Sequence, residues 1–125
     1  MPFGSARLLA GALCLVLLGC EIAGPSQNLT GRWGGAGAEL VAGATTTTLE
    51  LACVAGEFVT RPEVTNGRFE APVRLESLNY GVTVVAEGEV SGDILRLTLR
   101  FPDGPETFLL RLGRGGEFGD RICAA

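Results

Sequence analysis

The chain has 125 residues, and its ten basic side chains against fourteen acidic ones give a formal net charge of −4 at pH 7. All ten basic residues are arginine; without histidine or lysine, a Ser-His or Cys-His nucleophile, an imidazole metal ligand and a lysine Schiff base are excluded. The acidic balance also argues against a nucleic-acid partner, which requires clustered positive charge. We therefore expect no enzyme activity, no metal and no cofactor.

The chain begins with a short leader. Residues 1–7 carry one positive charge, Arg7, and residues 8–18 are apolar. As a helix this run would reach roughly 17 Å at about 1.5 Å per residue, well short of the about 30 Å of a bilayer core. The pattern predicts a signal peptide over residues 1–19 and no membrane-spanning helix.

The leader ends in Leu17-Leu18-Gly19-Cys20, which resembles the lipobox of bacterial lipoproteins. This resemblance implies that Cys20 is acylated and becomes the first mature residue, followed by a tether over residues 20–28. It places the domain outside the cytoplasm, periplasmic or on the surface, anchored to the bacterial cell envelope by more than one acyl chain, since a single chain binds only marginally. Leu18 is bulkier than the residue usual in its position, and a plain secretory signal is the alternative.

Four cysteines are present. Cys14 leaves with the leader and Cys20 takes the lipid, so Cys53 and Cys123 remain in a compartment where disulfides persist. A bridge between them would close a loop of about 70 residues and stabilise the domain by roughly 4 kcal/mol in the chain-entropy model. Two buried free thiols are the alternative.

Residues 29–125 form one domain with strand-like alternation of apolar and polar side chains. Such alternation is typical of half-buried antiparallel strands with one face in water. The apolar positions that alternate with polar neighbours are Leu49, Leu51 and Cys53; Phe69, Ala71, Val73 and Leu75; Leu95, Leu97, Leu99 and Phe101; and Phe108, Leu110 and Leu112.

Turn signals separate these runs. Asn66-Gly67 predicts a tight primed turn, because both central positions need positive φ. Ser91-Gly92-Asp93 and Pro102-Asp103-Gly104-Pro105 join later runs. Successive hairpins of this kind predict an all-β, small antiparallel up-and-down β-barrel, with a two-sheet sandwich as the alternative. The glycine clusters at residues 34–37 and 113–116 are expected in loops and bends.

Gly31-Arg32-Trp33 resembles the start of the first strand in lipocalins and the avidin group. There the tryptophan plugs one end of the barrel and an arginine from the last strand covers it. The resemblance implies that Trp33 is a structural barrel plug covered by Arg121, with Arg111 as second choice, through a cation–π contact.

A wider pattern is similar to a set of small secreted bacterial β-barrel proteins that have no assigned function. It comprises the Trp33-Gly34-Gly35 start, a mid-chain cysteine and Arg121-Ile122-Cys123 near the end. This resemblance supports a barrel and a Cys53–Cys123 bridge, and it implies no activity. The chain departs from the pattern by being shorter between Leu75 and Tyr80.

Two hypotheses for function follow. The first is a binding module of the cell envelope whose partner is an envelope protein, a glycan or a small apolar compound. The second is a structural envelope lipoprotein with a side-chain-filled barrel and no ligand. Glu87 and Glu89 lie two apart on one strand face, a spacing that favours solvated surface over an acid–base pair. The leucine, valine and phenylalanine expected inside the barrel favour a packed lumen.

Overall fold

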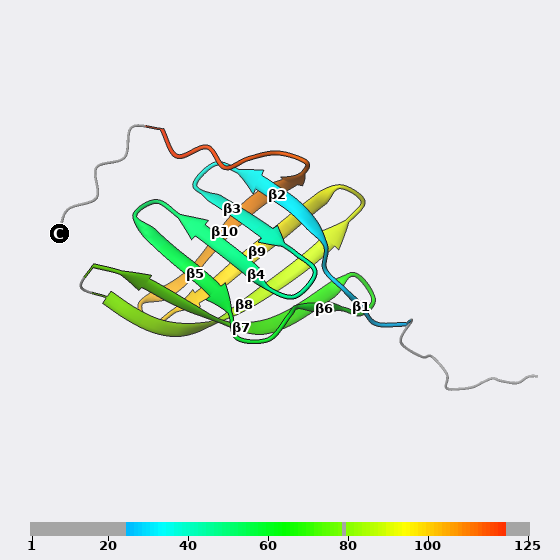
Figure 1. The fold of residues 1–125 in the computed structure, drawn as a ribbon, viewed down its shortest axis with the longest axis horizontal. Helices are drawn as coiled ribbons and strands as arrows, with labels where there is room; N and C mark the ends of the chain where they lie inside the picture. Colours follow the sequence, from blue (N-terminus) through cyan, green and yellow to red (C-terminus); the bar gives the residue numbers. More distant parts are fainter. Residues whose placement is uncertain (1–24, 79, 120–125) are drawn as a thin grey trace, which may run out of the picture.

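The fold is a closed antiparallel β-barrel, seen in a computed structural model that describes residues 25–78 and 80–119. Eight strands surround the lumen in the order β10-β2-β3-β4-β5-β7-β8-β9, so each barrel strand pairs with the next along the chain (Figure 1). The predicted up-and-down barrel is confirmed. The leader, Cys20, Arg121 and Cys123 lie outside the described residues.

The first four barrel strands have five residues each, and the last four have eight to twelve. The barrel strands are β2 (Gly31–Gly35), β3 (Ala38–Ala42), β4 (Thr47–Leu51), β5 (Val54–Phe58), β7 (Arg68–Ser77), β8 (Tyr80–Ser91), β9 (Ile94–Phe101) and β10 (Gly104–Leu112). A separate two-stranded sheet joins β1 (Gln27–Asn28) to β6 (Glu63–Val64). Within the described part of the chain there is no helix, and hence none long and apolar enough to cross a membrane.

The lumen is filled by side chains. The alternating apolar rows face inward, and Leu40, Leu75, Leu95, Leu97, Leu99 and Leu110 have no exposed surface. At one end of the barrel the rings of Phe58 and Phe69 meet edge to face, with their centroids 6.4 Å apart. Burying each of these large apolar side chains contributes about 1.5–3 kcal/mol, so the lumen is the hydrophobic core of the domain.

The predicted primed turn is also confirmed. Asn66 and Gly67 have φ values of 55° and 74°. Thr65 and Arg68 flank them and exchange two backbone hydrogen bonds of 2.9 and 3.1 Å. Positive φ at both central residues matches the right-handed twist of the flanking strands. The turn therefore sets the register in which β7 begins.

The barrel has two distinct ends. We call the end where β2, β4, β7 and β9 begin the entry end; residues 59–67, which include β6, lie there. The opposite end, with the β4–β5 turn at residues 52–53, is the far end. Chain direction alternates around an up-and-down barrel, so both residues 25–30, which precede β2, and the start of β7 are at the entry end.

The barrel closes through a short seam between its first and last strands. β10 and β2 pair at only two positions, Arg111 with Gly34 and Leu112 with Trp33. Residues 113–119 then run along β2 and extend the seam. Gly113 N–H donates to Arg32 O at 2.6 Å, and Glu117 exchanges 2.8 Å backbone hydrogen bonds with Gly35 and Gly37.

Two glycines make this seam possible. A Cβ at Gly34 would lie 2.3 Å from the carbonyl group of Gly115, and one at Gly35 would lie 2.3 Å from the carbonyl oxygen of Leu109. The expectation of a loop over residues 34–37 is therefore wrong for Gly34 and Gly35, which belong to β2. They are glycine because another stretch of backbone occupies the space of a side chain.

Replacing Gly34 by alanine tests this seam. We expect Gly34→Ala to displace residues 113–116 and to cost about 1–3 kcal/mol, the usual penalty of overpacking. For a domain of this size each kcal/mol lowers the melting temperature by roughly 4–8 °C. Gly81→Ala is the matched control, because a Cβ there meets nothing within 4 Å. Equal melting temperatures for the two variants would contradict the close-approach explanation.

Candidate functional site

Trp33 lies in the core at the entry end. Its side chain is 4% exposed, and its Nε1–H donates to Thr30 O at 3.0 Å. Arg111 does not cover it: Arg111 alternates with the buried Leu110 and is exposed on the outer wall. Arg61 lies in the segment at the same end of the barrel, where its Nη2 donates to Gly43 O at 3.4 Å. Cover by Arg121 falls outside the described residues and stays a prediction.

Cys53 occupies the tight turn between β4 and β5 at the far end. Its φ is 66°, in the left-handed region, and it is half-buried. The C-terminal segment reaches the same end, because Glu117 is hydrogen-bonded to Gly37 and the next residue, Ala38, pairs with Leu51. Cys123 lies outside the described residues, so the bridge between the two cysteines stays a prediction.

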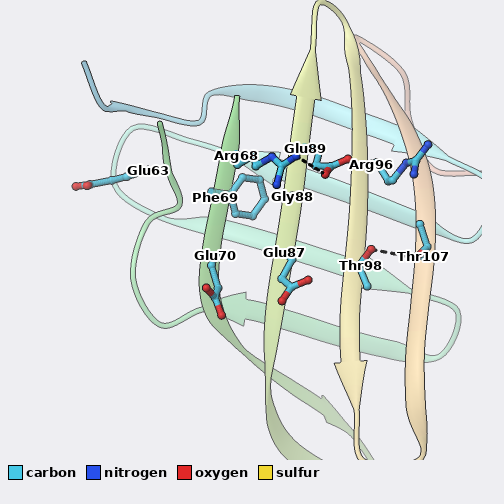
Figure 2. A pocket seen from close by; sticks show the side chains of 10 residues that line it. All are labelled: Glu63, Arg68, Phe69, Glu70, Glu87, Gly88, Glu89, Arg96, Thr98 and Thr107. Atoms are coloured by element: carbon cyan, nitrogen blue, oxygen red, sulfur yellow. Dashed lines mark hydrogen bonds and ion pairs between the residues drawn. The ribbon is translucent and has the colours of Figure 1, made fainter. Parts of the chain in front are cut away.

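A depression lies on the outer wall, across β7, β8, β9 and β10 (Figure 2). Its volume is about 630 Å³. We call it the outer groove. Its polar side chains on β7 and β9 alternate with buried ones: Arg68 and Glu70 flank Phe69, and Arg96 and Thr98 flank Leu97. The alternation that fills the barrel thus also lines its outer surface with charge.

The register of the strands places the lining side chains in two rows that run across the strands. The first row runs Arg68, Glu89 and Arg96, and the second runs Glu70, Glu87, Thr98 and Thr107. Phe69, Gly88 and Glu63 of β6 complete the lining, and the Glu63 side chain points away from the rows (Figure 2). Four carboxylates against two guanidinium groups leave the lining with an excess of negative charge.

The first row is only loosely paired. Arg68 Nη2 and Glu89 Oε2 are 3.5 Å apart, with side chains 76% and 52% exposed. Arg96 lies directly opposite Glu89 on β9, but its side chain makes no hydrogen bond or ion pair within the described residues. Exposed ion pairs of this kind contribute about 0–1 kcal/mol, so folding stability does not account for the row.

The second row contains a repulsive contact. Glu70 and Glu87 are directly opposite on β7 and β8, and like charges in that position destabilise a sheet. Arg100 offsets the repulsion on Glu87, because its Nε and Nη2 donate to the two carboxylate oxygens of Glu87 at 2.9 and 3.0 Å. These hydrogen bonds lower the pKa of Glu87 and raise the pKa of Arg100, to which Glu70 adds a smaller attraction. Glu70 has no ion pair of its own among the residues described.

The groove can bind a polar group. It combines guanidinium donors, carboxylate acceptors and the hydroxyls of Thr98 and Thr107, which are 3.0 Å apart and hydrogen-bonded to each other (Figure 2). One hydroxyl donates to the other, so the second proton is available to a ligand. A general acid needs a raised pKa, whereas Arg100 holds Glu87 ionised. The groove therefore presents both hydrogen-bond donors and acceptors to a polar group.

Sequence reasoning identified Glu87 and Glu89 only as surface residues and did not identify the groove. The signal was the charged face of each alternating strand. Bringing Arg68 and Glu70 beside them requires the register of β7 against β8, which periodicity alone does not specify.

A smaller depression of about 240 Å³ lies over β4, β5 and β7, beside Gly56 and Arg74. Arg74 there is paired with Glu76 at 2.7 Å. Among residues 25–78 and 80–119, no group of three or more Asp, Glu or Cys side chains is placed to hold a metal ion. Comparison with family models, with curated proteins and with solved structures finds no match to this chain.

A second polar cluster secures the seam. Glu39 on β3 accepts a hydrogen bond from Arg32 Nε at 2.6 Å and another from the Gly116 N–H at 3.0 Å. Its side chain is 13% exposed. The Gly116 hydrogen bond, and after it the Arg32 hydrogen bond, lower the pKa of Glu39. One carboxylate thus joins β2, β3 and the C-terminal segment.

This cluster predicts a pH dependence. Because the folded-state pKa of Glu39 is lowered, its stabilisation is complete above the ordinary glutamate pKa of about 4.3 and is lost as the pH falls through the folded-state value. We expect Glu39→Gln to lose about 1–2 kcal/mol at neutral pH, because a hydrogen bond to a charged group is lost.

Thermal unfolding across the acid range checks this expectation. The gap in melting temperature between wild type and Glu39→Gln should narrow below about pH 4. Glu57→Gln, at an exposed position on β5, should stay close to wild type throughout. A difference in melting temperature that is independent of pH would show that the charge of Glu39 does not hold residues 113–119 against the barrel.

Proposed function

We propose that this protein is a lipid-anchored module of the bacterial cell envelope that binds its partner on the outer wall of its barrel. The observation that carries the proposal is the contrast between the two faces of the sheet. The lumen is filled by buried apolar side chains, whereas the outer wall has a groove of about 630 Å³ lined mainly by charged and hydroxyl side chains. Binding in the lumen, as in the lipocalins that Gly31-Arg32-Trp33 resembles, is not part of the proposal.

The anchoring half of the proposal rests on the leader. Leu17-Leu18-Gly19-Cys20 supports acylation of Cys20 and a location outside the cytoplasm, on the periplasmic or the outer surface. The topology supports a Cys53–Cys123 bridge there, because Glu117 and the Cys53 turn reach the same end of the barrel. Such a bridge would fasten the C-terminal segment to the β4–β5 turn.

Charge indicates the kind of partner. The groove lining has an excess of carboxylates, and Glu70 sits opposite another carboxylate without an ion pair of its own in the described structure. A cationic group in the groove would relieve the Glu70–Glu87 repulsion. We therefore propose a basic segment of an envelope protein as the partner, in preference to a glycan or a small apolar compound.

A structural lipoprotein without a ligand is the second candidate. The observation in its favour is the filled lumen, together with the pairing of Glu87 to Arg100 and of Glu89 to Arg68. On that account the outer charges serve only to keep the domain soluble, and no position on the wall would be favoured for contact.

Site-specific crosslinking in intact cells tests the proposal. A photo-reactive amino acid at Thr107, in the groove, should give a discrete adduct, and the same amino acid at Val41, exposed on the opposite wall, should not. Glu70→Gln should weaken the Thr107 adduct, whereas Glu106→Gln, at an exposed position outside the groove, should leave it unchanged. Equal labelling at Thr107 and Val41, or none at either, would favour the structural candidate.

The same membrane fraction tests the anchor separately. Intact mass spectrometry should show a chain that begins at Cys20, carries acyl mass and is two hydrogens lighter because of the Cys53–Cys123 bridge. An unacylated chain would refute the anchor and leave the groove result standing.

A further inference from the structure

The tether is fastened to the barrel before it reaches β2. Gln27 and Asn28 pair with Val64 and Glu63, and the Ser26 and Thr65 hydroxyls are 2.5 Å apart. Leu29 N–H donates to Pro62 O at 2.9 Å, and the Leu29 side chain is 4% exposed. We call this arrangement the clasp; it consists of residues 26–29 and 62–65.

Because of the clasp, the tether leaves the barrel beside β6 and not at the start of β2. β2 begins at Gly31, on the wall opposite β7 in the closed order of strands. The residues just before β2 cross the entry end, because β1 pairs with β6. β6 in turn leads through the Asn66-Gly67 turn into β7 (Figure 1). The tether therefore departs beside the groove wall, and Glu63, which pairs with Asn28, itself lines the groove.

The stretch of chain between the clasp and Cys20 is short. Ser26 is the sixth residue after Cys20, and a fully extended chain spans at most about 3.3–3.6 Å per residue, so the two residues are at most about 20 Å apart. If Cys20 carries the lipid, the point beside β6 stays within that distance of the bilayer surface. The wall formed by β7 and β8 is then held nearer to the membrane than the wall formed by β2 and β3.

We propose that the clasp orients the barrel with its groove wall toward the bilayer, so that the partner is a basic segment of an integral membrane protein close to the lipid surface. This inference rests on the proposed anchoring through Cys20. The excess of carboxylates in the groove supplies the complementarity to a basic segment, and the departure of the tether beside Glu63 supplies the location.

Depth-dependent quenching tests the orientation. A fluorescent amino acid is placed at Ser91, at the entry end of β8, or at Val41, exposed on β3 directly across the barrel. The acylated protein is reconstituted in phospholipid vesicles that carry a quencher on the headgroup. We expect quenching at Ser91 to exceed quenching at Val41 several-fold, and equal quenching at the two positions would overturn the proposal.

Two variants separate the clasp from the tether. Gln27→Pro combined with Ser26→Ala removes a backbone donor and the Ser26 hydroxyl from the clasp, and it should raise quenching at Val41 relative to Ser91. A Gly/Ser insertion between Gly24 and Pro25 leaves the clasp intact and lengthens the tether, and it should reduce the difference between the two positions. Circular dichroism verifies that both variants retain the β-sheet signal. If the clasp variant keeps the wild-type difference, the clasp does not orient the barrel.

Cys20→Ala distinguishes failure of the anchor from failure of the orientation. We expect this variant to lose quenching at both positions, because it no longer associates with the vesicles. If it is still quenched, the proposed anchor is wrong. If it is not quenched while the acylated protein shows equal quenching at Ser91 and Val41, the anchor stands and the orientation is wrong. In cells, a Thr107 adduct with lipid alone would overturn the protein partner.

Discussion

The close approach of two backbone segments at Gly34 and Gly35 is the constraint on which the barrel depends. β2 has only five residues and meets β10 at two positions, so strand pairing alone closes the sheet weakly. Residues 113–119 complete the closure by hydrogen bonding along β2, and within them the backbone of Arg114 and Gly115 lies where a side chain at Gly34 would otherwise be. Glu39 then joins that segment to β2 through Gly116 and Arg32. Closure of the sheet in turn buries the lumen and leaves the barrel wall without a free edge along β2.

A closed and filled barrel has consequences for function. With six leucines fully buried inside, the domain uses its lumen as a core, and its outer wall is the surface available for contact. The strand alternation gives each strand one charged face, but the register of β7, β8 and β9 gathers those charges into the rows of the groove. The Glu70–Glu87 contact is unfavourable for the sheet itself. Local conflicts of this kind are expected where a surface serves binding.

Much of the fold could be predicted from the sequence, and little of the site. Period-two alternation and the Asn66-Gly67 pair specified antiparallel strands, a primed turn and a meander, because these are local properties. The assignment of Gly34 and Gly35 to a loop failed because their composition resembles a turn, while the backbone that packs against them, at Gly115 and Leu109 respectively, is far away in sequence. The groove was missed for the same reason: Glu70, Glu87 and Arg100 meet only through cross-strand register. Residues 26–28 were predicted to belong to a tether, whereas β1 within them pairs with β6. A two-residue strand is too short to give a periodic pattern in the sequence.

The central claim is that the barrel interior is a packed core and that recognition occurs outside it. Titration of the folded domain with an apolar fluorescent ligand tests this most directly, with emission from Trp33, the only tryptophan, as a reporter inside the barrel. A packed core predicts no saturable binding and no change in Trp33 emission over the concentration range in which lipid-binding barrels saturate. Saturable one-to-one binding accompanied by a change in Trp33 emission would contradict the account, because it would require an open lumen.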